Sequence, residues 1–216
     1  MFIDDDTRKR LENIVKGNVL EGEEDTCTTV RNLLCASFRT STTVKKDFEG
    51  QLLVKKEQAE FLKHHGSLQN WFKSTLPDER SFLTRGGEAE IYMAPDRRNV
   101  IKLNDAIYYA TWLEFFNSLV IHNLLFEDTA YIFLGFVARD ELLLAVLEQP
   151  FITSDAPVEL EDLKKLLAFN GFKNTKRNDY YNDELGLILE DMHDENVLVN
   201  SNKLFFIDTV FYTVST

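Results

Sequence analysis

Residues 187–208 read LILEDMHDENVLVNSNKLFFID and contain three short apolar runs bordered by polar residues, of which the last two are close together. The runs Val197–Val199 and Leu204–Ile207 are rich in residues that favour β-strands. Between them stands Asn200-Ser201-Asn202, a group typical of a tight turn. The sequence therefore predicts a β-hairpin at residues 197–207.

Three polar residues border this hairpin. Asp191 and Asn196 stand five residues apart before its first strand, and Asp208 follows its second strand. Asp and Asn beside turns commonly serve only backbone hydrogen bonds, and an Asp after a strand commonly caps the next element. The same side chains can also supply a base and the oxygen ligands of a hard cation.

Upstream, residues 81–148 predict a five-stranded antiparallel sheet with one long helix across it, from about Ala110 to Phe126. Gly86 and Gly87 fall in the first strand connection, and Lys102 lies in the third strand. A glycine pair is usually only a turn, and a strand-end lysine is usually a solvated charge. With a further helix near Leu160–Asn170, the fold class is α+β.

Residues 1–80 are predicted to be helical, with helices starting at Asp6 or Thr7, at Asp25 or Thr26, and near Lys46. These 80 residues are nearly neutral, whereas residues 81–216 carry most of the net charge of −12. This shift in charge predicts a division into residues 1–80 and residues 81–216.

The composition excludes several classes of protein. A hydrophobic content of 44% and a charged content of 28% are typical of a soluble globular protein. The net charge of −12 repels phosphate backbones, so it disfavours binding to nucleic acid and to anionic membranes. No apolar run is long enough to cross a bilayer, and the acidic start Met1–Asp6 does not resemble a signal peptide. We therefore expect a cytoplasmic protein.

Taken together, the polar positions supply the parts of phosphoryl transfer from a metal-bound nucleotide. A glycine turn at Gly86-Gly87 can cover phosphates, and Lys102 can neutralise phosphate oxygens. Asp191 can meet the attacking hydroxyl, while Asn196 and Asp208 can hold Mg²⁺ or Mn²⁺.

On these residues the chain resembles the protein kinase and kinase-like phosphotransferase superfamily over about residues 81–212. Lys102 matches the strand lysine, Asp191 and Asn196 match the catalytic-loop pair, and Asp208 matches the metal-binding aspartate. The strings GGEAEIY, VIKLND, LEQPFI, NDYYNDELGLILEDMHDENVL and LFFID resemble more narrowly the kinase domain of polyvalent proteins of bacterial phages and conjugative elements.

The resemblance implies a kinase-like fold, with an N-lobe at residues 81–148, a much reduced C-lobe at residues 149–216 and a helical N-terminal extension. It implies ATP as substrate and an acceptor that is an unknown protein or small molecule. His193 lies where related enzymes carry Lys or His, so it either touches the transferred phosphate or braces the loop. Glu114, the acidic residue well inside the long helix, is the expected partner of Lys102.

The sequence also departs from the family pattern. Glu148 and Gln149 lie where adenine is recognised by backbone groups, but the usual donor falls on Pro150, which has no N–H. Either Gln149 or Phe151 donates instead, or adenine is held differently. Only Gly86 of the three loop glycines remains, and few residues follow Asp208, so the usual acceptor platform is not expected. Residues 1–80 either supply the missing bulk or accompany a decayed fragment.

Two functions follow. The first is an ATP-dependent phosphotransferase, of the serine/threonine/tyrosine kinase-like type. The second is a catalytically inactive kinase-fold module that binds nucleotide or a protein partner. The thinned glycine loop favours the second function, and retention of all four polar positions favours the first.

Overall fold

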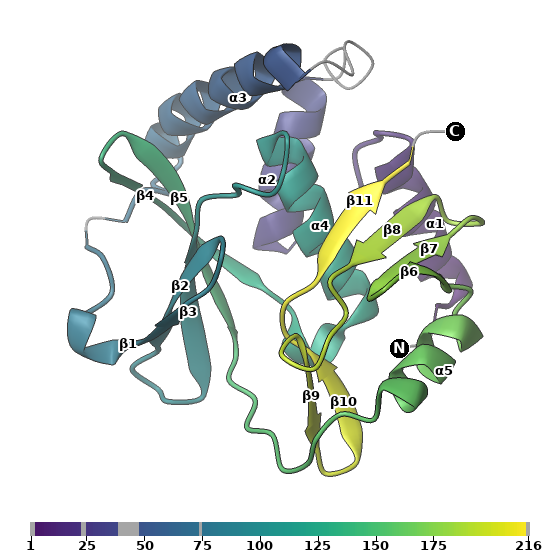
Figure 1. Cartoon of the computed structure of the whole chain (residues 1–216). Coiled ribbons are helices and arrows are strands. Elements are labelled where there is room, and N and C mark those ends of the chain that lie inside the picture. Colours follow the sequence, from purple (N-terminus) through teal and green to yellow (C-terminus); the bar gives the residue numbers. More distant parts are fainter. Residues whose placement is uncertain (1–2, 23–24, 39–47, 74, 215–216) are drawn as a thin grey trace. The chain divides into compact units, whose positions relative to one another are not determined.

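The structure, a computed structural model, describes residues 3–22, 25–38, 48–73 and 75–214 (Figure 1). The chain divides into two compact units. Unit 1 comprises Met1–Gly22, Asn117–Ala130 and Ile152–Thr216, and unit 2 comprises Glu23–Phe116 and Tyr131–Phe151. Each unit has its own antiparallel sheet structure, and mixed helices and strands confirm the α+β class.

Unit 2 contains one five-stranded antiparallel sheet in the order β1-β2-β3-β5-β4 (Figure 1). Its strands are β1 (Phe82–Arg85), β2 (Ala89–Met93), β3 (Asn99–Asn104), β4 (Ile132–Arg139) and β5 (Leu142–Pro150). The predicted five-stranded antiparallel sheet is therefore confirmed.

The two faces of this sheet carry different side chains because neighbouring residues of a strand point to opposite faces. The register sets Lys102 opposite Ile91 and Leu147, so these three share one face. Leu103 packs with Tyr92 and other apolar residues of the sheet in a cluster on the other face. We call the first the lysine face and the second the outer face.

The edge of the sheet at β4 is covered by a short segment around Phe72, which pairs in parallel with Phe136. The Phe136 N–H donates to the Trp71 carbonyl at 2.8 Å, and the Lys73 N–H donates to the Phe136 carbonyl at 2.8 Å. Gly135 makes this approach possible, since its φ is +143° and a Cβ there would lie 2.0 Å from the Trp71 carbonyl oxygen.

Three helices belong wholly or partly to unit 2: α2 (Thr26–Ser37), α3 (Phe48–Leu68) and the first turn of α4 (Trp112–Leu125). Asp25 caps α2, so the helix begins at Thr26, which is one of the two predicted starts. The predicted start of the third helix near Lys46 lies outside the described residues, and α3 ends at Leu68. Aromatic rings of α4 pack edge-on against Phe133 and Phe136 of β4.

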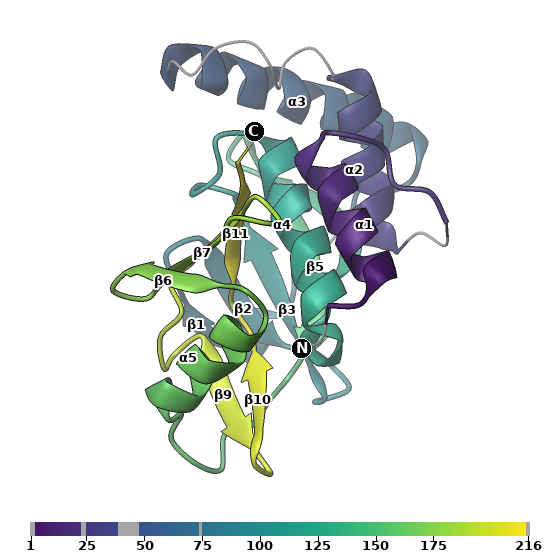
Figure 2. The ribbon, with the colours of Figure 1, turned by 90° about the vertical axis from the view of Figure 1, so that its right-hand side faces the viewer.

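Unit 1 contains a two-stranded sheet, β10-β9, and a four-stranded sheet, β11-β8-β7-β6 (Figure 2). The strands are β6 (Lys173–Lys176), β7 (Asp179–Asn182), β8 (Leu187–Glu190), β9 (Val197–Asn200), β10 (Lys203–Phe206) and β11 (Val210–Thr213). The predicted hairpin at Asn200-Ser201-Asn202 is confirmed by the β9–β10 pairing. β6, β7 and β11 were not expected from the sequence.

The helices of unit 1 are α1 (Asp5–Val15), α5 (Leu160–Phe169) and the remainder of α4, with the 3₁₀ turn η2 (Glu127–Thr129). Asp4 caps α1 by accepting the Thr7 N–H at 2.8 Å, so the expected cap at Asp6 or Thr7 is wrong. Asp4 is the better cap because Asp5 and Asp6 then fall in the first turn, near its unpaired N–H groups. Of the helices described, none is both long and apolar enough to span a bilayer.

Candidate active site

The loop between β8 and β9 carries the first predicted residues. Asp191 begins it with φ of +64°, a left-handed conformation that is costly for a residue with a side chain. Its N–H donates to Asp179 Oδ1 at 3.3 Å, and the next N–H, of Met192, donates to the Asn178 carbonyl at 3.0 Å. Burial of the Met192 side chain adds a further anchor. The turn between β6 and β7 thus holds this strained loop.

The side chains of Asp191, His193 and Asn196 meet within the loop. Asn196 Nδ2 donates to the Asp191 carbonyl at 2.9 Å and to Asp191 Oδ2 at 3.2 Å. His193 Nε2 lies 3.3 Å from Asp191 Oδ1. Both oxygens of the Asp191 carboxylate therefore have a neighbour that fixes their direction.

Both ring nitrogens of His193 have polar neighbours within the loop. The Glu195 N–H donates to Nδ1 at 3.2 Å. Nε2 lies 3.3 Å from Asn196 Nδ2 and 3.3 Å from Asp191 Oδ1. These contacts are compatible with a bracing role for His193, and its contact with the transferred phosphate stays a prediction.

The hairpin brings Asn196 and Asp208 to the same end of two paired strands. Val197 pairs with Phe206, and the Ile207 N–H donates to the Asn196 carbonyl at 3.0 Å. Asp208 is the next residue and is half-buried. Because the described hydrogen bonds of Asn196 use its N–H, its carbonyl and Nδ2, its Oδ1 is the atom left for a cation. A carboxylate and an amide oxygen are ligand types that suit Mg²⁺ or Mn²⁺, and their joining at one cation stays a prediction.

Negative charge gathers beside this pair. Burial first, and then repulsion by Asp179 and Asp191, raise the pKa of Glu190 above its ordinary value. A cation bound nearby would relieve that repulsion. Within the described part of the chain, no three His, Cys, Asp or Glu side chains form a metal cluster. The Asn196–Asp208 pair would therefore share its cation with phosphate and water oxygens.

The segment after Asp208 is fastened to α4 by buried polar contacts. His122, fully buried, lies 2.7 Å from Thr209 Oγ1 through Nδ1 and 2.9 Å from the Thr129 carbonyl through Nε2. The Phe211 N–H donates to Ser118 Oγ at 2.9 Å. The sequence did not predict these contacts of His122. A single histidine in an apolar helix was the one available indication, and such a residue usually only packs in the core.

Replacing His122 with phenylalanine is expected to lower the free energy of unfolding by about 2 kcal/mol, because two buried polar groups lose their partner. Urea unfolding checks this expectation. Thr209→Val, which removes one of those two contacts, should cost less. Equal stabilities of His122→Phe and wild type would show that the brace contributes nothing.

Unit 2 holds the remaining predicted residues, beginning with Lys102. Its side chain is buried on the lysine face, with Nζ 3.5 Å from Tyr131 Oη and 5.3 Å from the centre of that ring. A buried ammonium on a rigid strand is suited to an anion, since few waters compete for it. The role of Tyr131 had no signal in the sequence.

The glycine turn is packed against a tyrosine. The Gly86 N–H donates to the Ala89 carbonyl at 2.9 Å and closes the β1–β2 connection. A Cβ on Gly87 would lie 1.9 Å from Tyr108 Oη. Neither glycine has a left-handed φ, and a side chain at position 87 would require Tyr108 to move.

Glu114 does not show the expected ion pair with Lys102 among the described contacts. It lies in the first turn of α4, where its Oε2 accepts the Ala110 N–H at 2.9 Å. The Thr111 hydroxyl accepts the Glu114 N–H at 3.1 Å, and Gln58 Oε1 accepts the Leu113 N–H at 3.0 Å. Desolvation by burial raises the pKa of Glu114. Glu114 thus caps its own helix, and its pairing with Lys102 stays a prediction.

The segment expected to recognise adenine continues as strand β5. Gln149 is buried opposite Val100, and Glu148 stands opposite Ile101. The Phe151 N–H donates to the Arg98 carbonyl at 2.8 Å. Of the two donors that the sequence left open, Phe151 is therefore already engaged.

The structure thus brings Asp191, His193, Asn196 and Asp208 together in unit 1. It places Gly86, Gly87, Lys102, Glu114, Glu148 and Gln149 in unit 2. Convergence of Lys102 with Asp208 on one cleft stays a prediction, because these residues belong to separate units.

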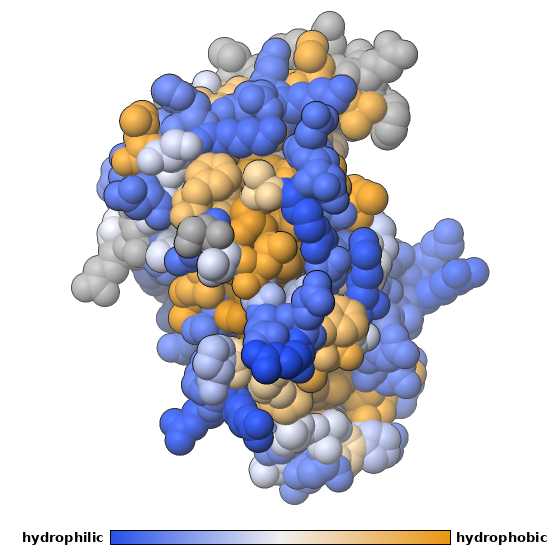
Figure 3. Space-filling view, turned by 90° about the vertical axis from the view of Figure 1, so that its left-hand side faces the viewer, coloured by the Kyte–Doolittle hydropathy of each residue, from blue (hydrophilic) through white to orange (hydrophobic). Residues whose placement is uncertain are grey.

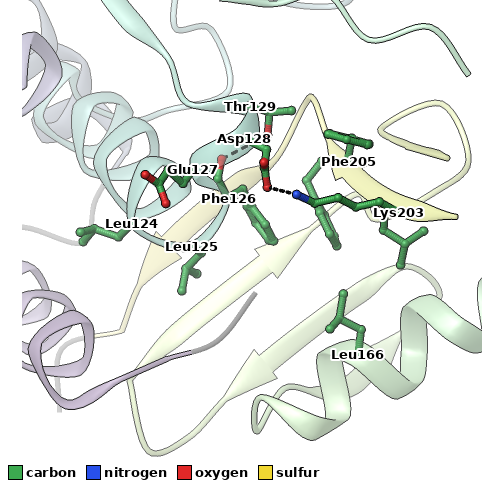
Figure 4. Close-up of a pocket in the computed structure, with 11 residues that line it drawn as sticks. Leu124, Leu125, Phe126, Glu127, Asp128, Thr129, Leu166, Lys203 and Phe205 are labelled. Atoms are coloured by element: carbon green, nitrogen blue, oxygen red, sulfur yellow. Dashed lines mark hydrogen bonds and ion pairs between the residues drawn. The ribbon is translucent and has the colours of Figure 1, made fainter. Parts of the chain in front are cut away.

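A pocket of about 280 Å³ in unit 1 is separate from these residues (Figure 4). It is lined by residues 124–129 and 203–206 and by Leu166, with Lys203 Nζ 2.6 Å from Asp128 Oδ2. None of the predicted site residues lines it. It is therefore not the candidate active site.

Comparison with known proteins shows the family of the chain. Residues 55–215 match the family described as serine/threonine/tyrosine kinase found in polyvalent proteins. The match starts inside α3 and includes every predicted site residue. No curated protein matches the sequence. Since the match covers well over half of the 216 residues, the chain belongs to the family of serine/threonine/tyrosine kinases found in polyvalent proteins.

Proposed function

We propose that the chain is a phosphotransferase that moves the γ-phosphoryl group of Mg-ATP to the hydroxyl of a protein or small-molecule acceptor. The observation that carries this proposal is the loop in which Asp191 is fixed by His193 and Asn196, beside a hairpin that sets Asn196 next to Asp208. The loop thus presents the acidic and amide side chains that phosphoryl transfer from a metal-bound nucleotide needs.

Each residue then has a role. Asp191 orients the acceptor hydroxyl and takes its proton as the hydroxyl oxygen bonds to the γ-phosphorus and the bond to ADP breaks. Asn196 Oδ1 and Asp208 hold Mg²⁺, which neutralises charge on the phosphates when bound. Lys102 contacts the phosphates, and His193 is a positioning residue for Asp191.

The domain organisation is part of the proposal. Residues 81–148 form the N-lobe, residues 149–216 form a reduced C-lobe, and residues 1–80 form a helical extension. The family match begins at residue 55, so the second part of α3 is included with the kinase-like region. Within unit 2, α3 also contacts the approach to α4, where Lys55 Nζ donates to the carbonyls of Ala106 and Tyr109 at 2.6 and 2.9 Å. We propose a cytoplasmic setting.

A second candidate function is an inactive kinase-fold module. It is favoured by the packing of Tyr108 against Gly87, which occupies the turn meant to cover phosphates. The Phe151 N–H already donates to the Arg98 carbonyl and is not available to adenine, which also favours the inactive module. Tyr108 is exposed, so its displacement by nucleotide would reconcile the turn with the first function.

Thermal unfolding tests the binding of metal and nucleotide, on which the first function depends. ATP with Mg²⁺ is expected to raise the melting temperature of the wild type, whereas ATP with a chelator is not, because bare carboxylates repel the phosphates. Asp208→Asn should lose most of the shift, and Asp194→Asn, an exposed neighbour, should keep it. Equal shifts with and without metal would refute the assignment, and no shift at all would favour the inactive module.

A further inference from the structure

The outer face of the unit 2 sheet carries an apolar groove of about 720 Å³. A strap made of residue 73 and residues 75–83 forms one wall, and the sheet forms the floor. Figure 3, seen from the side of β1 and β4, shows apolar side chains gathered in the middle of this face and hydrophilic side chains around them. The groove lies on the face opposite to Lys102, so the proposed catalytic chemistry does not use it.

The strap is held in place at both ends. The Lys73 N–H is bonded to the Phe136 carbonyl at the β4 edge, and at the other edge the last two strap residues, Phe82 and Leu83, belong to β1, which pairs with β2. Between these ends, the 3₁₀ turn η1 (Glu79–Ser81) is capped by Asp78, which accepts the Arg80 N–H at 2.9 Å. Asp78 Oδ2 also lies 2.7 Å from Arg80 Nη2. The wall of the groove is therefore a built structure.

The lining is apolar and partly open to water. On the strap, Leu76, Phe82 and Leu83 expose 46%, 47% and 46% of their surface. On the floor, Ile101 and Leu134 are only partly buried. Three large exposed apolar side chains around one groove are unusual on a soluble surface and favour an apolar occupant.

The rim of the groove has a charge opposite to that of the chain. Lys73 and Arg97 line it and are exposed, and neither forms an ion pair within the described residues. Its one carboxylate, Asp78, is already paired with Arg80. In a protein with a net charge of −12, this rim is a local cationic site. Charge complementarity therefore selects an acidic partner.

The shape of the partner follows from β1. In the sheet β1 is an edge strand, and its described pairing is with β2 alone. An edge strand presents N–H and C=O groups to which an extended chain can add. An extended segment also sends alternate side chains to one face, which suits a groove beside that edge.

We propose that this groove binds an extended peptide segment of a partner protein in which apolar residues alternate with Asp or Glu. The apolar side chains enter the groove between the strap and the sheet, and the carboxylates face Lys73 and Arg97. The site is independent of the proposed catalytic function.

The test uses the full chain and a short fluorescein-labelled peptide that alternates Leu or Phe with Glu, followed by fluorescence anisotropy. Wild type is expected to bind it with an affinity that falls as salt rises. The double variant Lys73→Glu/Arg97→Glu should weaken binding about tenfold or more, and Leu83→Ser should also weaken it. Arg98→Glu is the matched control, since Arg98 is an exposed neighbour that does not line the groove.

Any of three binding results would overturn the proposal. They are no binding of the peptide by wild type, equal binding of a peptide with Lys in place of Glu, and unchanged binding by the double variant. A dimer in sedimentation experiments that Leu83→Ser dissociates would also overturn it, because a second copy would then be the occupant. Thermal unfolding of each variant, matched to wild type, confirms that the fold is intact.

Discussion

Replacing Asp191 with asparagine is expected to lower the rate of ADP formation by about a thousandfold, the order of magnitude that a positioned base contributes. Asparagine keeps the shape of the side chain and its place in the loop but cannot take a proton. The hydrogen bond from Asn196 Nδ2 can survive at the retained oxygen. The loss should therefore appear in kcat rather than in the binding of Mg-ATP.

The comparison needs a matched substitution in the same loop. Asp194→Asn changes the same chemical group three residues on, where the side chain is 79% exposed, and should leave the rate close to that of wild type. If Asp191→Asn forms ADP as fast as wild type, Asp191 is excluded as the base.

The largest expected effect on stability is at the β4 edge. Replacing Gly135 with alanine is expected to lower the free energy of unfolding by about 3 kcal/mol. Its φ of +143° is unfavourable for any residue with a Cβ, and the new Cβ would lie 2.0 Å from the Trp71 carbonyl oxygen. Because that oxygen is backbone, the paired segment at Trp71 must shift and lose its hydrogen bonds to Phe136.

Gly86→Ala is the matched control, since the nearest atom to its new Cβ is the Ala89 carbonyl oxygen at 3.9 Å and its φ is ordinary. Chemical denaturation of the two variants checks the difference. Equal stabilities of Gly135→Ala and Gly86→Ala would show that the paired segment at Trp71 is not a structural part of the sheet.

The sequence predicts the unit 2 sheet and the β9–β10 hairpin because their apolar runs are short, rich in β-branched residues and separated by turn residues. It does not predict β6, whose residues Lys173–Lys176 are polar and fully exposed. That strand forms because its backbone groups pair with β7, which no pattern of hydrophobic residues records. The sequence does not predict β11 for a related reason, since its pairing partners in β8 lie 20 to 26 positions upstream.

The candidate site is likewise predictable from the sequence only in part. The spacing of Asp191, Asn196 and Asp208 is local, so the hairpin that relates them is predictable from residues 187–208. The partner of Lys102 depends on the rotation of α4, and capping of that helix by Glu114 is decided by the loop before it. The His122–Thr209 contact joins residues 87 positions apart and has no local signal.

The measurement that tests the central claim most directly is the paramagnetic broadening of backbone amide NMR signals by Mn²⁺-ATP. If Asn196 and Asp208 hold the metal, signals of residues 191–196 and 206–209 are broadened first in the wild type. In Asp208→Asn the same signals should stay sharp at the same concentration, because a carboxylate ligand is lost. Broadening centred on another part of the chain, or equal broadening in the variant, would contradict the assignment of these residues as the metal–nucleotide site.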